Sequence, residues 1–99
     1  MSFCTANVSV ERRLFDAVGG FDPAMQYWGL DDTDLGYRLH IAQARGWHSL
    51  RSAVVHLDPE GSGAGESHEE RMRSYRLHME VLYRKHLSSS ILDSFSFLQ

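Results

Sequence analysis

Apolar and polar positions along the chain predict three helices and two short strands. Apolar residues recur at helical spacing over residues 10–18, 31–46 and 67–87, which we interpret as helices. Apolar and β-branched runs at residues 3–8 and 47–57 are typical of strands. The pattern therefore predicts an α/β fold of short strands with two or three helices.

The predicted helices carry recognisable end signals. Ser67 and Glu70 have the spacing of a capping box, in which each residue's side chain bonds the other's backbone N–H. Gly19 and Gly20 are expected to end the first helix, because glycine adopts the left-handed conformation without steric cost. Gly36 lies inside the second helix, where glycine costs about 1 kcal/mol relative to alanine. We therefore expect another part of the chain to approach the backbone closely at Gly36.

Composition and charge exclude several functional classes. The chain has 99 residues, of which 42% are hydrophobic and 23% charged, values ordinary for one small globular domain. The 10 Lys and Arg residues are outnumbered by 13 Asp and Glu, and this net charge of −3 argues against a nucleic-acid partner. No apolar run approaches the roughly 20 residues that span a bilayer. The lone Cys4 cannot form an internal disulfide. With no signal segment at the N-terminus, we expect a cytoplasmic location, and membrane association through regions outside this chain is the alternative.

An acidic cluster at the predicted start of the second helix is the most informative stretch. Asp31, Asp32 and Asp34 follow Trp28 and Gly29, and Asp31 is the expected N-cap. The positive end of the helix dipole favours ionised carboxylates there. Such carboxylates can take a proton from a hydroxyl as a general base or bind a polyol, and Trp28 offers an apolar face for a sugar ring. The alternative is that these residues only cap the helix.

Three segments resemble, in order and spacing, the nucleotide-sugar glycosyltransferases: residues 5–10 (TANVSV), 14–22 (LFDAVGGFD) and 28–39 (WGLDDTDLGYRL). More narrowly, they resemble the C-terminal part of the GT-A catalytic domain of family 2 enzymes and their galactosyltransferase-like relatives. The resemblance covers residues 3–57. It implies a partial GT-A fold that lacks the N-terminal nucleotide-binding half. Residues 1–87 then form the acceptor and metal side of the domain, and residues 88–99 a tail.

The resemblance also implies site residues. The family pattern is Trp-Gly-x, an acidic pair, x and Asp. Asp32 fills the second acidic position and is implied as the catalytic base of an inverting transfer, while Asp31 fills the first, where Glu is more frequent. Trp28, Gly29 and Asp31 belong to the implied acceptor site, together with Arg38, which is expected to pair with an acidic group. The implied reaction moves a sugar from a nucleotide-sugar donor to a hydroxyl acceptor.

His56 is the implied metal ligand. Metal-dependent relatives often place a histidine at the end of a strand after this helix, and the apolar run before His56 fits that placement. Manganese or magnesium is therefore expected in the complete enzyme. The alternative is that His56 binds no metal and only makes hydrogen bonds at the end of a strand. The other histidines lack close ligand spacing, and we interpret them as surface or helix-face residues: His40, His48, His68, His78 and His86.

Two alternatives to a transferase stay open. An exposed apolar stripe would suit a non-catalytic, self-associating module derived from a truncated glycosyltransferase: Met72, Tyr75, Met79 and Leu82. A small metal-binding protein using His56 and the acidic cluster is the second alternative. Because no donor-binding part is visible, we expect the chain alone to be inactive, and an unpaired sheet edge predicts a homo-oligomer.

Overall fold

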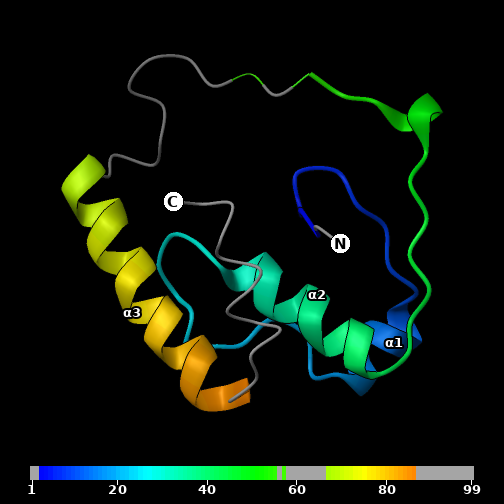
Figure 1. Ribbon diagram of the computed structural model, residues 1–99. Helices are drawn as coiled ribbons and strands as arrows, with labels where there is room; N and C mark the ends of the chain where they lie inside the picture. Colours follow the sequence, from blue (N-terminus) through cyan, green and yellow to red (C-terminus); the bar gives the residue numbers. More distant parts are fainter. Residues whose placement is uncertain (1–2, 56, 58–66, 87–99) are drawn as a thin grey trace.

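The computed structural model describes residues 3–55, 57 and 67–86, and these ranges contain three α-helices (Figure 1). Helix α2 lies between the other two, with α3 crossing beside it and α1 next to its C-terminal half. The helices and one 3-10 turn have these bounds: α1 Arg12–Ala17, α2 Asp31–Ile41, η1 Leu50–Ser52 and α3 His68–His86.

The predicted α/β fold is wrong, because the described ranges contain no β-strand. Residues 3–8 contain a turn at Thr5–Ala6, and η1 interrupts the run from residue 47 to 55. A strand is stable only when its backbone groups pair with a neighbouring strand. Here the two segments meet instead through a side-chain hydrogen bond, which Asn7 donates to the Ser52 carbonyl. The partial GT-A fold built on short strands is therefore not what these residues form.

Local signals correctly predicted two helix ends. The Ser67 N–H donates to the Glu70 carboxylate at 2.7 Å, and the Glu70 N–H donates to the Ser67 hydroxyl at 3.2 Å, so the capping box is confirmed. Gly19 and Gly20 have φ angles of 89° and 67° after α1. The Gly20 N–H closes that helix with a 2.9 Å bond to the Phe15 carbonyl.

Helix α2 differs from its prediction at both ends. Its N-cap is Leu30, which has a left-handed φ of 66°, so the expected cap Asp31 is instead the first helical residue. At the other end, Gln43 has a φ of 64° and the Ala44 N–H bonds the Leu39 carbonyl at 3.0 Å. This left-handed turn stops α2 several residues before its predicted end.

The core joins α2, α3 and the loop between α1 and α2. Its buried apolar side chains are Met25, Leu30 and Leu82, with three partly buried residues packed on them: Tyr37, Tyr75 and Val81. Burying each large apolar side chain contributes about 1.5–3 kcal/mol. Leu82 belonged to the stripe considered as an exposed docking face, but it is completely buried and therefore part of the core.

The close approach expected at Gly36 is confirmed. A Cβ added there would lie 2.8 Å from Cγ of Phe3, so the Phe3 side chain packs directly against the α2 backbone. Gly36 thus allows the N-terminal segment to lie on α2.

Gly36→Ala is therefore expected to destabilise the domain despite its better helix propensity. The gain of about 1 kcal/mol from alanine is outweighed by overpacking, which costs about 1–3 kcal/mol. Urea unfolding measures the net change in the free energy of unfolding. In a Phe3→Gly background the obstacle is gone, and the same substitution should stabilise. A stabilising effect in both backgrounds would contradict the observed packing.

Candidate active site at the start of helix α2

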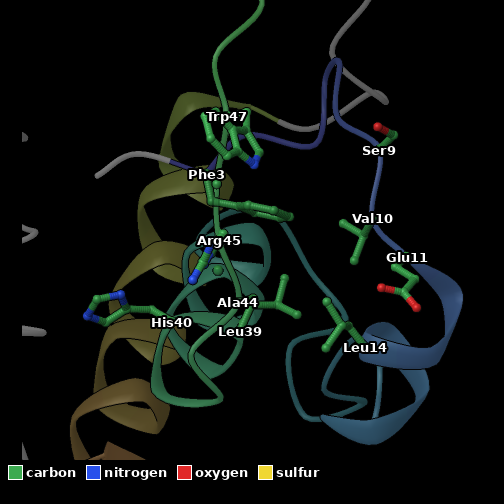
Figure 2. Close-up of a pocket in the computed structure, with 12 residues that line it drawn as sticks. Phe3, Ser9, Val10, Glu11, Leu14, Leu39, His40, Ala44, Arg45 and Trp47 are labelled. Atoms are coloured by element: carbon green, nitrogen blue, oxygen red, sulfur yellow. The ribbon is translucent and has the colours of Figure 1, made fainter.

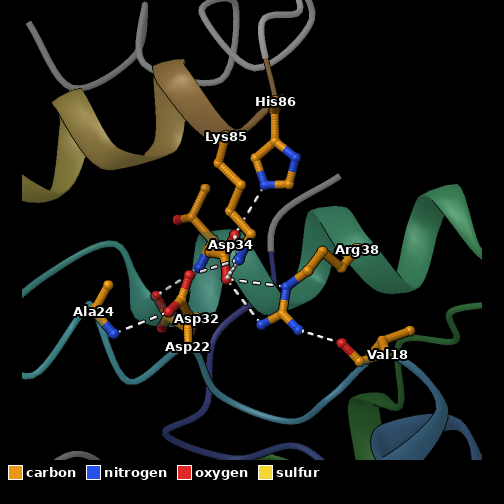
Figure 3. Close-up of polar contacts among 9 residues, drawn as sticks. Val18, Asp22, Ala24, Asp32, Asp34, Arg38, Lys85 and His86 are labelled. Carbon is orange, nitrogen blue, oxygen red and sulfur yellow. Dashed lines mark hydrogen bonds and ion pairs between the residues drawn. The ribbon is translucent and has the colours of Figure 1, made fainter.

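Asp34 is fully buried, and the side chains of Arg38, Lys85 and His86 surround its carboxylate (Figure 3). Arg38, one turn later on α2, approaches it with Nε at 3.0 Å and Nη2 at 2.8 Å. The last turn of α3 adds Lys85 Nζ at 3.2 Å and His86 Nε2 at 2.8 Å. A buried carboxylate is stable only when it is paired. Asp34 is therefore the electrostatic link between α2 and the C-terminal end of α3.

The Asp34 cluster also fastens the segment that follows α1. Arg38 Nη1 donates to the Val18 carbonyl at 2.6 Å. Lys85 Nζ donates to the Asp22 carboxylate at 2.7 Å, and that carboxylate also accepts the Ala24 N–H at 2.9 Å. These contacts hold the loop between α1 and α2 in place.

Asp22 is expected to make stability sensitive to acid. The Lys85 hydrogen bond, helped by the Ala24 N–H, lowers the pKa of Asp22 below its ordinary value of 3.8. Its contribution to folding is therefore present above that value and is lost as the pH falls through it toward the lower native pKa. Asp22→Asn should make the free energy of unfolding fall less steeply below about pH 4, measured by urea unfolding at a series of pH values. The control is Asp16→Asn, at an exposed carboxylate. An unchanged acid dependence in Asp22→Asn would contradict the assignment.

The backbone turn before α2 is bound directly to α3. The Ser74 hydroxyl donates to the Trp28 carbonyl at 2.7 Å. His78 bonds the Gly29 carbonyl through Nδ1, which must carry the proton because a carbonyl only accepts. Gly29 has a φ of 98°, a conformation that favours glycine. The Trp-Gly turn is thus hydrogen-bonded to a helix that is distant in the chain.

The Trp28 ring is supported by α3 and partly open to solvent. It lies 6.5 Å from the Tyr75 ring at a 41° tilt, and the Arg71 guanidinium is 5.7 Å from its centroid. Burial raises the pKa of Tyr75. Because 42% of Trp28 stays exposed, the indole keeps accessible apolar surface.

Asp31 and Asp32 occupy the first turn of α2 and are partly exposed. One Asp32 oxygen accepts the Thr33 N–H at 3.0 Å, and the other accepts the Thr5 N–H at 3.4 Å. Asp32 and Asp34 are two positions apart, about 200° around a helix of 3.6 residues per turn. They therefore face in opposite directions, Asp34 into the core and Asp32 away from it.

A separate pocket of about 270 Å³ lies between the C-terminal half of α2 and the N-terminal segment (Figure 2). Figure 2 shows the Phe3 and Trp47 rings at one end and Val10 and Leu14 across from Leu39. Along α2, His40 of this pocket is about 12 Å from Asp32 at 1.5 Å per residue. The predicted site residues that the structure describes do not line this pocket.

The described residues form no metal site on their own. Among them, no three His, Cys, Asp or Glu side chains are grouped so that they could share a metal ion. The buried Asp34 carboxylate is surrounded by cationic groups, which oppose a metal cation. His56, the predicted ligand, lies outside the described residues, as do residues 88–99.

Comparison with known proteins identifies the domain. The sequence model of a family described as the N-terminal domain of galactosyltransferase matches residues 1–53, more than half of the chain. The chain belongs to this family. The match includes the Trp-Gly turn and the whole acidic cluster, and it ends before α3.

Two curated glycosyltransferases are similar to this chain over a longer stretch than the 53 residues that the family model matches. Both are named validoxylamine A glucosyltransferase, from Streptomyces hygroscopicus subsp. jinggangensis strain 5008 and from S. hygroscopicus subsp. limoneus. Each is 36% identical over 86 residues, which is 87% of this chain. The chain spans 19% and 18% of their lengths, about a fifth. No solved structure matches significantly. The predicted glycosyltransferase-like domain is thus confirmed, while its placement in the C-terminal part of a GT-A domain stays a prediction.

The structure of this glycosyltransferase domain brings four of the predicted site residues together. Trp28 and Gly29 lead directly into Asp31 and Asp32 at the N-terminus of α2. Arg38 lies one turn after Asp34 and pairs with it, so the expected pairing with an acidic group is present. A direct contact of Arg38 with an acceptor stays a prediction.

No helix in the described ranges is long and apolar enough to cross a membrane.

Two histidines that we interpreted as surface or helix-face residues take part in the architecture of the site. His78 is only 2% exposed and bonds the Gly29 carbonyl, and the mostly buried His86 bonds Asp34. Neither histidine has the close spacing to another ligand that is typical of a metal site, so that criterion did not identify them. The i, i+4 spacing of Ser74, His78 and Leu82, all buried on one face of α3, is the signal that was available.

Proposed function

We propose that this domain supplies the acceptor-binding and catalytic-base portion of a glycosyltransferase. The reaction moves a sugar from a nucleotide-sugar donor to a hydroxyl acceptor with inversion at the anomeric carbon. The observation that carries the proposal is the partly exposed Asp31–Asp32 pair in the first turn of α2, beside the half-exposed Trp28, in a chain of a galactosyltransferase family.

Asp32 is the proposed general base. Thr33 and Thr5 N–H groups each bond one of its oxygens, which leaves further lone pairs free to accept a proton. As the acceptor hydroxyl attacks the anomeric carbon, its proton passes to Asp32, and the nucleoside diphosphate leaves from the opposite face. The same two amides would orient the carboxylate before the attack.

Trp28 and Asp31 are the proposed acceptor-binding groups. The exposed part of the indole offers an apolar surface on which a sugar ring can lie. Asp31, one residue from the base, is placed to accept hydrogen bonds from a polyol. Gly29 contributes by its conformation, since it shapes the turn that carries both groups.

A divalent metal, manganese or magnesium, is proposed for the complete enzyme because His56 matches the family's ligand position. Within the described ranges, no three His, Cys, Asp or Glu side chains are grouped so that they could hold a metal ion by themselves. No step above therefore uses the metal.

A transfer assay tests the proposal in a longer enzyme that carries this domain. The similarity to validoxylamine A glucosyltransferases makes validoxylamine A the first acceptor to test, with uridine diphosphate glucose and uridine diphosphate galactose as donors. We expect acceptor-dependent release of uridine diphosphate and a product of inverted anomeric configuration. Retained configuration would exclude Asp32 as the base of a direct displacement.

A further inference from the structure

Two polar residues of α3 bind consecutive carbonyl groups just before the Asp31–Asp32 pair. Ser74 donates to the Trp28 carbonyl, and His78 donates to the Gly29 carbonyl. Ser74 and His78 are one turn apart on α3, so their side chains lie on the same face. They are 7% and 2% exposed, and this buried face of α3 is directed at the turn.

The turn that they bind has a conformation that needs support. Gly29 and Leu30 both have positive φ angles, 98° and 66°. A left-handed backbone is unfavourable for a residue with a side chain and persists only where the surrounding structure determines it. Here the support comes from the two hydrogen bonds and from packing of the buried Leu30 with Met25 and Leu82.

The acidic pair is attached to α3 on both of its flanks. The carbonyls of residues 28 and 29 precede it and bond Ser74 and His78. Asp34 follows it and bonds the Lys85–His86 end of the same helix. The position of the Asp32 carboxylate is therefore set by a helix that begins more than 30 residues later in the chain.

We propose that Ser74 and His78 are positioning residues for the transfer site. Their hydrogen bonds hold the turn that carries Trp28 and aims the Asp31–Asp32 pair at the acceptor. This inference rests on the proposed function. Since a displacement of about 1 Å can reduce a rate about a hundredfold, such contacts act on the chemical step without touching the substrate.

The first test measures the turn itself in the chain as it stands. Replacing Trp47 by Phe leaves Trp28 as the only tryptophan, and acrylamide quenching then reports its accessibility. His78→Leu and Ser74→Ala, which remove the donors, should increase the quenching. His78→Asn keeps an N–H donor near the position of Nδ1 and should resemble the wild type. The matched control is His68→Leu, the same substitution at an exposed position of α3.

The second test measures transfer in a longer enzyme that carries the domain, with the donors and acceptor named above. His78→Leu and Ser74→Ala should lower kcat about tenfold or more while KM for the donor stays within about twofold, because the base is misplaced and donor binding is not. His78→Asn should recover most of the lost kcat, and His68→Leu should match the wild type.

The outcomes separate this inference from the proposed function. Unchanged Trp28 quenching in a folded His78→Leu variant overturns the inference, whatever the transfer assay shows. A kcat loss that His78→Asn does not restore also overturns it, since packing would then explain the loss. Equal transfer by the wild type and Asp32→Asn defeats the proposed base, and Trp28 quenching still decides whether α3 holds the turn. If His78→Leu does not fold, the smaller change Ser74→Ala decides the same point.

Discussion

Asp34→Ala is expected to destabilise the domain more than any other single substitution of a charged residue in the described ranges. The side chain is completely buried, and removing it leaves the mostly buried Arg38 guanidinium and the His86 ring beside a cavity without the carboxylate that pairs them, while Lys85 keeps only Asp22. Breaking a buried pair by deleting one partner costs about 3–5 kcal/mol. The free energy of unfolding of a small domain is about 5–15 kcal/mol, so Asp34→Ala should remove a large fraction of it.

Urea unfolding followed by circular dichroism measures the effect of Asp34→Ala. The matched control is Asp16→Ala on α1, whose partner Arg12 lies at 3.7 Å and whose side chain is 65% exposed. Exposed pairs contribute about 0–1 kcal/mol, so this variant should be nearly as stable as the wild type. Equal stability of the two variants would show that the Asp34 cluster is not the link between α2 and α3.

Asp32→Asn is expected to cause the largest loss of activity with little loss of stability. General-base catalysis contributes about a hundredfold to ten-thousandfold to a rate, and the amide of asparagine cannot take the proton. The amide oxygen can still accept a bond from the Thr33 or Thr5 N–H, so the local geometry is kept. The rate of acceptor-dependent release of uridine diphosphate in a longer enzyme that carries this domain measures the loss.

Two controls make the Asp32 result specific. Nucleotide binding measured by calorimetry should be unchanged, because the variant alters the acceptor side. Asp16→Asn, the same chemical change at an exposed position of α1, should transfer at the wild-type rate. Transfer by Asp32→Asn at an unreduced rate would remove Asp32 from the mechanism.

The features predicted correctly from the sequence depend on partners close by in the chain. The partners in the capping box, Ser67 and Glu70, are three positions apart, and the closing bond of the glycine turn after α1 joins residues five positions apart. Gly36 is an intermediate case. Its cost inside a helix predicted a close approach, but only the structure showed that Phe3 is the neighbour.

The features predicted wrongly or missed depend on partners that are distant in the chain or absent from the described residues. The segments predicted as strands needed a pairing partner that the described residues do not supply, so η1 and a turn form instead. Helical periodicity of apolar residues identified Leu82 but not His78, because a buried polar residue is recognised only through its partner. That partner, the Gly29 carbonyl, is 49 positions away in the chain.

The sequence by itself determined the family, the helical segments and the acidic cluster after the Trp-Gly pair, because these depend on residue identity and local spacing. Only the tertiary structure decided that Asp34 is buried while Asp32 faces away from the core. It also decided that α3 binds the turn at Trp28 and Gly29, which precedes both carboxylates. The helical period separates the two carboxylates by face. Which face is buried depends on Lys85 and His86, which reach Asp34 from more than 50 residues later in the chain.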